Sequence, residues 1–183
     1  MQFRRTLLVL ILISFTGMLM AQYRYASAQF RITVAPASVI RIFPVVPISL
    51  NMGPSIAGST ASNQTNDVTY LQVTTINAGS SLKNIQVQIT GGMIPAGTLL
   101  KVKASPCTIG TGSGTFGSVS VQRTLSSTLS QTLVSGIGSC YTGNELNQGY
   151  KLTYSWELDP NNLVNLKAYT TAGAFVTYTI SSW

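Results

Sequence analysis

The stretch that decides the fold class is YKLTYSWEL, which occupies residues 150–158. Its even positions carry apolar side chains and its odd positions carry polar ones. Alternation with period two is typical of a β-strand that buries one face and exposes the other. Residues 84–90 (NIQVQIT) repeat the pattern, with Ile85, Val87 and Ile89 expected to point inward. These two segments predict a protein built from half-buried strands.

Further short strands are predicted along the chain, between turn signals rich in Gly, Pro, Asn and Asp. They are residues 30–35, 39–43, 48–52, 67–76, 100–104, 118–122, 131–134 and 174–180. No amphipathic helical pattern separates them, as a parallel sheet would require. The apolar content of 45% is too high for a disordered chain. The expected fold is therefore all-β, a single antiparallel Ig-like or pilin-like β-sandwich.

The N-terminal segment has the three parts of a cleaved signal peptide. Arg4 and Arg5 form a basic start, an apolar run follows, and residues 26–28 (ASA) are the small residues that signal peptidase reads. A membrane anchor is the alternative, but the apolar run from 7 to 21 has 15 residues, fewer than the about 20 that span a bilayer. The expected division of the chain is a signal peptide at 1–28, an apolar N-terminal arm at 29–50 and a β-sandwich domain at 51–183.

Charge is sparse in the expected mature chain. Without Arg4, Arg5 and Arg24, eight of the 11 basic residues remain beside four acidic ones, a net charge of +4. The remaining basic residues are scattered, apart from Lys101 and Lys103, and form no stripe of the kind that binds nucleic acid. We expect a secreted, extracellular or cell-surface protein with no nucleic-acid partner and no stable membrane insertion after signal cleavage.

Cys107 and Cys140 are the only cysteines. An exported chain meets oxidising conditions, which favour disulfides. A bond between the two would close a loop with 32 intervening residues and stabilise the fold by about 3–4 kcal/mol. Free thiols and a metal site are the alternatives, but the chain has no His, and two thiolates alone seldom hold zinc. We expect a Cys107–Cys140 disulfide, with no metal and no cofactor.

No catalytic residues are expected, because acid–base chemistry needs paired titratable groups and the chain has no His. Glu157 and Asp159 are spaced as a carboxylate pair could be. A solvated strand end followed by a turn explains both residues better. The protein is therefore not expected to be an enzyme.

Two features could carry binding or modification. Tyr141, beside Cys140 in a Gly-rich loop, is the candidate exposed aromatic for a glycan or surface ligand. Tyr150, Tyr154 and Trp156 could form a stacking platform, but the leucines on the same strand face favour a core position. Asn63 begins the triplet Asn-Gln-Thr, a glycosylation acceptor pattern that also occurs by chance.

The segment AGAFVTYTI, residues 172–180, resembles the last strand of secreted bacterial fimbrial-subunit and spore-coat-U-type domains. Residues 166–169 (LKAY) are similar to the usual approach to that strand. The resemblance implies an incomplete Ig-like sandwich, an N-terminal strand soon after the signal peptide, one disulfide and no enzymatic activity. We therefore expect a structural subunit of an extracellular filament (pilus- or fimbria-like) or surface layer that binds other copies of itself. A secreted monomeric binding module or adhesin for glycans or a host surface is the alternative.

The apolar arm at 29–50 could act as an assembly strand that completes a neighbouring subunit by donor-strand exchange. Prolines at 36, 44 and 47 interrupt it, and Pro suits strands that add at a sheet edge. Such an edge can be filled by a foreign strand through main-chain hydrogen bonds and side-chain pockets. The alternative is that these residues are the first strands of their own sandwich. The candidate assembly residues are Phe30, Ile32, Val34, Val39, Ile40, Ile42 and Phe43.

Overall fold

The structure, a computed structural model, describes residues 30–53, 56–107, 112–168 and 172–182. The expected signal peptide lies outside the described residues. The chain divides into two compact units, Met1–Val34 and Ala35–Trp183. The described part of the first unit, residues 30–34, forms no regular secondary structure. The second unit holds all the strands described below.

Two antiparallel sheets form the second unit, and the expected all-β sandwich is confirmed. The seven-stranded sheet contains β1 (Ala37–Phe43), β2 (Gln64–Ile76), β4 (Thr98–Ala104), β5 (Ser113–Gly114), β7 (Arg123–Thr124), β9 (Cys140–Tyr141) and β10 (Tyr150–Leu158). The four-stranded sheet contains β3 (Lys83–Gly92), β6 (Ser118–Val119), β8 (Gln131–Ile137) and β11 (Ala174–Ser182). A short 3-10 helix, η2 (Leu163–Asn165), precedes β11. Among the described residues, no helix has the length and hydropathy needed to cross a membrane.

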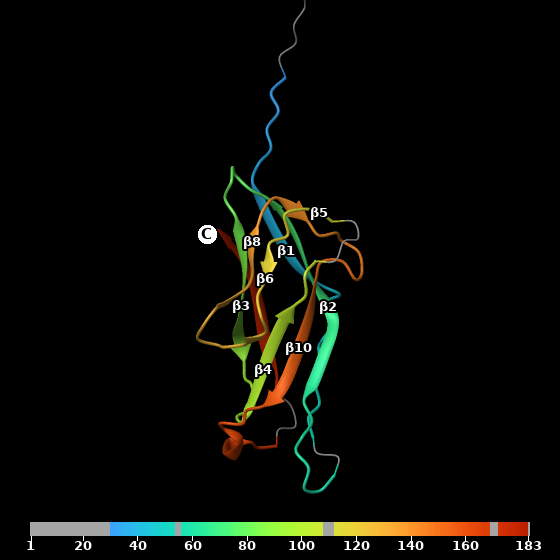
Figure 1. The fold of residues 1–183 in the computed structure, drawn as a ribbon, viewed down its shortest axis with the longest axis vertical. Helices are drawn as coiled ribbons and strands as arrows, with labels where there is room; N and C mark the ends of the chain where they lie inside the picture. Colours follow the sequence, from blue (N-terminus) through green and yellow to red (C-terminus); the bar gives the residue numbers. More distant parts are fainter. Residues whose placement is uncertain (1–29, 54–55, 108–111, 169–171, 183) are drawn as a thin grey trace, which may run out of the picture. The chain divides into compact units, whose positions relative to one another are not determined.

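The larger sheet has the strand order β5-β9-β2-β10-β4-β7, with β1 paired to β2. Figure 1 shows β4, β10 and β2 side by side in this layer. The smaller sheet has the order β11-β3-β8-β6. Its edge strand β11 lies close to β1 of the larger sheet. Two strands that are far apart in the sequence therefore meet along one side of the sandwich.

The hydrophobic core lies between the sheets, where the two alternating segments of the sequence meet. On β10, Tyr150 and Leu152 are fully buried and Tyr154 is 5% exposed. On β3, Ile85 and Val87 are buried in the same way. The prediction that the even positions of 150–158 face the core is confirmed for the first three of them. Trp156, near the end of β10, is only half-buried.

Two of the predicted strands near the N-terminus are absent from the structure, and both lie next to prolines. Residues 30–35 and 48–52 are not strands. Prolines stand next to both segments, and proline cannot donate the backbone hydrogen bond that a ladder needs. Ile48 still packs against the core, because burying an apolar side chain does not require strand pairing. The strands β5, β7 and β9 were not predicted, because two-residue segments show no measurable alternation.

Candidate functional sites

The outer edge of β11 is the first candidate site. Within the described residues, β11 pairs with β3 along one side and with no strand along the other. The side chains that β11 directs at the core are only half-buried, namely Ala174, Val176, Tyr178 and Ile180. Their counterparts on β3 (Ile85, Val87 and Ile89) are all at most 5% exposed. The sandwich is therefore less well covered along β11 than along β3.

The neighbouring edge strand β1 contains four of the candidate assembly residues, Val39, Ile40, Ile42 and Phe43. It pairs with β2 of its own chain from Ala37, opposite Ile76, to Phe43, opposite Tyr70. Ile40 and Ile42 are half-buried and pack against the core. The structure therefore places these residues in their own sandwich, as the alternative interpretation of the arm describes.

The other three candidate assembly residues lie before β1 and have a different environment. Phe30, Ile32 and Val34 are 85%, 87% and 70% exposed. They alternate with Arg31 and Thr33, so an extended segment would present all three apolar side chains on one face. From here on, the name "arm" refers only to residues 30–34, the part of the expected 29–50 arm that carries these three side chains. The arm thus has the side-chain pattern of a half-buried strand without the burial.

One hydrogen bond links β11 to the opposite sheet. The hydroxyl groups of Tyr178 on β11 and Tyr154 on β10 lie 2.7 Å apart. Burial raises the pKa of both phenols above the ordinary value, and the neighbouring Tyr154 raises that of Tyr178 further. Both side chains therefore remain protonated at physiological pH. Tyr178 fastens the exposed edge strand to the centre of the larger sheet.

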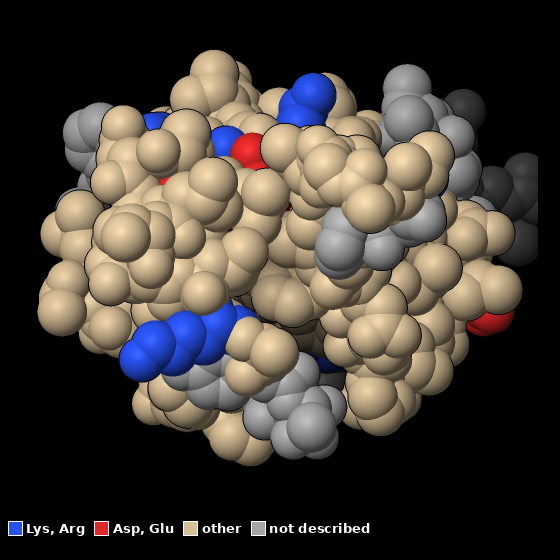
Figure 2. Space-filling model, turned by 90° about the horizontal axis from the view of Figure 1, so that it is seen from below, with Lys and Arg blue, Asp and Glu red and all other residues tan. Residues whose placement is uncertain are grey.

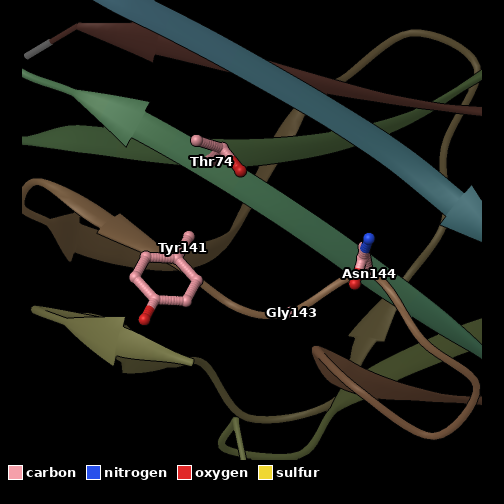
Figure 3. Close-up of a pocket in the computed structure, with 4 residues that line it drawn as sticks. All are labelled: Thr74, Tyr141, Gly143 and Asn144. Carbon is pink, nitrogen blue, oxygen red and sulfur yellow. The ribbon is translucent and has the colours of Figure 1, made fainter. Parts of the chain in front are cut away.

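A pocket beside β9 is the second candidate site (Figure 3). Thr74 of β2, Tyr141 of β9, and Gly143 and Asn144 of the following loop line it, around a volume of about 370 Å³. Thr74 pairs with Tyr141 across the two strands, which directs both side chains to the same outer face of the sheet. Tyr141 is 50% exposed, as expected for the candidate binding aromatic.

The loop that carries Asn144 is held by side chains from β1 and β2. Gln72, which is 3% exposed, donates through Nε2 to the carbonyl oxygens of Glu145 (2.7 Å) and Gln148 (3.2 Å). Arg41 donates through Nε to Gln72 Oε1 and through Nη2 to the carbonyl oxygen of Asn144, both at 2.7 Å. The wall of the pocket is therefore fixed before any ligand arrives.

A second fixed point lies where the loop leaves β9. The Thr142 hydroxyl is buried and accepts a hydrogen bond from the Val73 N–H at 2.9 Å. Gly143 follows with a φ of +91°, a backbone conformation that residues other than glycine rarely adopt. Sequence reasoning identified Tyr141 but missed Thr74 and Asn144. Only the strand register brings Thr74 opposite Tyr141, and that register is not visible in composition or motifs.

Cys107 and Cys140 are both free thiols in the structure, so the expected disulfide is not present there. Burial raises the pKa of each thiol, and the nearby Cys140 raises that of Cys107 further. Both groups also raise the pKa of Tyr150, whose main perturbation is its own burial. Cys140 and Tyr150 belong to the hydrophobic core, and Cys107 packs against it.

The candidate carboxylates are engaged in separate structural contacts. Glu157 Oε2 lies 2.5 Å from Lys101 Nζ on the adjacent strand. Asp159 Oδ1 accepts a hydrogen bond from the Asn161 N–H within the following turn, at 3.0 Å. These contacts are those of a strand end and a turn. In the view of Figure 2 charged atoms are few, and acidic atoms lie beside basic ones near the upper edge.

Asn63 lies in an exposed position directly before β2. An exposed loop position meets the steric requirement for glycosylation, and modification there stays a prediction.

No protein-family model matches the chain, and no curated protein shows significant similarity to it.

Proposed function

We propose that this protein is a structural subunit of an extracellular filament or surface layer, in which the arm of one copy adds to β11 of the next. The observation that carries the proposal is that two elements of the described chain each leave apolar surface uncovered. β11 has one side without a strand partner among the described residues, and its inward side chains are half-buried. The arm has exposed apolar side chains spaced for one strand face.

Main-chain hydrogen bonds would join the arm to the free side of β11, as in other cases where a peptide adds to a sheet edge. Phe30, Ile32 and Val34 would then cover the half-buried inward side chains of β11. Because β1 lies close to β11, Ile40 and Ile42 would also lose exposed surface. The resemblance of residues 172–180 to fimbrial-subunit domains supports the same function.

The energy available is sufficient for a lasting contact. Burying a large apolar side chain contributes about 1.5–3 kcal/mol, so three such side chains would contribute roughly 5–9 kcal/mol before the costs of association. Added backbone hydrogen bonds contribute about 0.5–1.5 kcal/mol each. A contact of this kind repeated from copy to copy gives a polymer, since donor and acceptor are different parts of each chain.

The proposal includes export and oxidation. Removal of residues 1–28 would expose the arm close to a new N-terminus at Gln29. Export would also allow Cys107 and Cys140 to form the disulfide, because an exported chain meets oxidising conditions. Intact mass spectrometry of secreted protein is expected to show a chain starting at Gln29 and lacking two hydrogens. A retained Met1, or two thiols that alkylate without reductant, would contradict this part of the proposal.

The test of assembly uses two matched substitutions in the full-length secreted protein. Ile32→Asp puts a charge on the apolar face of the arm, and Thr33→Asp puts the same charge on the opposite face. Sedimentation in detergent and negative-stain micrographs are expected to show polymers for the wild type and Thr33→Asp, and monomers for Ile32→Asp. A monomeric wild type, or equal polymerisation of both variants, would overturn the proposal.

A further inference from the structure

The pocket beside β9 is independent of the proposed assembly contact. It lies on the outer face of the larger sheet, whereas the assembly edge β11 belongs to the smaller sheet. Its lining residues come from β2, β9 and the loop that follows β9. Assembly through the arm gives these residues no role.

The volume and the lining limit the ligand. About 370 Å³ falls at the small end of the range for small-molecule sites. The lining contains one aromatic ring, two hydroxyl groups and one carboxamide, with no charged side chain (Figure 3). The nearest cation held at this loop, Arg41, already donates to Gln72 and to the Asn144 carbonyl. Anionic and lipid ligands are therefore poorly matched to these groups.

The polar groups that line the pocket are available. The Thr74 hydroxyl, the Tyr141 hydroxyl and the Asn144 carboxamide form no hydrogen bond to any other residue that the structure describes. A hydroxyl both donates and accepts, and a carboxamide offers two donors and an acceptor. The buried Gln72 and Thr142 hold the backbone of the loop that carries Asn144, so little ordering of that loop is needed when a ligand binds.

We propose that this pocket binds one ring of a neutral carbohydrate. A pyranose ring has an apolar C–H face that can stack on the Tyr141 ring, and its hydroxyl groups both donate and accept hydrogen bonds. Thr74 and Asn144 supply matching partners at the edge of that ring. If the subunits also assemble, each copy adds one such pocket, and many weak contacts to a glycan surface would act together.

The test is a titration of the full-length secreted protein with methyl glycosides of mannose, galactose and N-acetylglucosamine. Glucuronate serves as the acidic probe. At least one neutral glycoside is expected to bind, and Tyr141→Ala is expected to weaken it tenfold or more. Tyr141→Phe keeps the ring and should change the Kd by less than about threefold. Asn144→Ala should weaken binding about three- to tenfold, the range for one lost hydrogen bond.

Phe175→Ala is the matched control, since Phe175 is an exposed aromatic (74%) on the other sheet and should leave the Kd unchanged. Thermal unfolding of each variant checks that the fold is retained. Three results would overturn the proposal: no binding of any neutral glycoside by the wild type, binding that survives Tyr141→Ala, or binding of glucuronate alone.

Discussion

β10 and the arm have the same alternating pattern of side chains but different environments. β10 pairs with β2 on one side and with β4 on the other, and its inward side chains Tyr150, Leu152 and Tyr154 are buried. The arm pairs with no described strand, and Phe30, Ile32 and Val34 remain exposed. Period-two alternation therefore identifies the face that a strand would bury. It does not identify the chain that provides the partner.

β11 lies between these extremes. It has one partner strand, and its inward side chains are half-buried. The degree of burial thus rises with the number of neighbouring strands, from the arm through β11 to β10. We propose that the arm of another copy covers the inward side chains of β11, so that they become as buried as those of β10.

The largest expected effect comes from the same substitution made in the core and in the arm. Ile85 is fully buried and Ile32 is 87% exposed. Ile85→Ala should lower the free energy of unfolding by about 2–5 kcal/mol, because it removes buried carbon atoms and leaves a cavity. Ile32→Ala should change the stability of the dilute monomer by less than about 0.5 kcal/mol. Urea unfolding measures both, and a large loss for Ile32→Ala would show that the arm packs within its own chain.

The next effect concerns the link between β11 and the larger sheet. Tyr178→Phe leaves the buried Tyr154 hydroxyl without its partner and should lower the free energy of unfolding by about 1–3 kcal/mol. Chemical denaturation of the two proteins at neutral pH provides the measurement. An unchanged stability would mean that Tyr178 does not fasten β11.

The same two phenols make stability depend on alkaline pH. Their pKa values are raised in the folded state, so the unfolded chain loses these protons at lower pH than the folded protein does. The stabilisation is fully present below the unfolded pKa of about 10 and is lost progressively as pH rises above it. The phenolate absorbance of Tyr154 and Tyr178 should therefore appear together with unfolding. Ionisation of all tyrosines well before loss of structure would contradict the burial of Tyr154 and Tyr178.

A smaller effect is expected for Val87→Ala compared with Val176→Ala. Val87, on β3, is 1% exposed, whereas Val176, on β11, is half-buried. Val87→Ala should cost about 2 kcal/mol of monomer stability, from about 0.8 kcal/mol per buried carbon plus a cavity. Val176→Ala should cost less than about 1 kcal/mol in the monomer but should weaken assembly. Equal losses in the dilute monomer would contradict the difference in burial between β3 and β11.

The smallest expected effect lies on the outer face. Glu157→Gln removes the ion pair with Lys101 and should lower stability by no more than about 1 kcal/mol, with the difference shrinking in high salt. Unfolding at low and high salt provides the measurement. A loss as large as that of Ile85→Ala would mean that this outer face contributes as much as the core.

The sequence allowed the sheet class and much of the core to be predicted, because alternation directly reflects burial. Residues 150–158 and 84–90 alternate without interruption in the sequence, and both are strands. The inward side chains are buried along 84–90 and at the first three even positions of 150–158. Residues 30–35 alternate equally well and are not a strand. The difference lies in long-range pairing, which a local pattern cannot contain.

The candidate sites show the same limit. Tyr141 could be identified as an exposed aromatic because it lies among glycines in the sequence. Its neighbour Thr74 is 67 positions away, and only the register between β2 and β9 brings the two together. Gln72 appears in the sequence as an ordinary polar strand residue, yet it is buried and holds the loop of the pocket. Contacts of this kind depend on the complete fold.

The most direct measurement is hydrogen–deuterium exchange of the β11 amides, residues 174–182. Exchange is compared between assembled wild-type protein and the monomeric Ile32→Asp variant, with β10 as the internal reference. If the arm adds to β11, the amides on its free side should exchange at least about tenfold more slowly after assembly, while the β10 amides, already paired on both sides, change little. Assembled polymers in which β11 exchanges as fast as in the monomer would contradict completion of the sandwich by the arm.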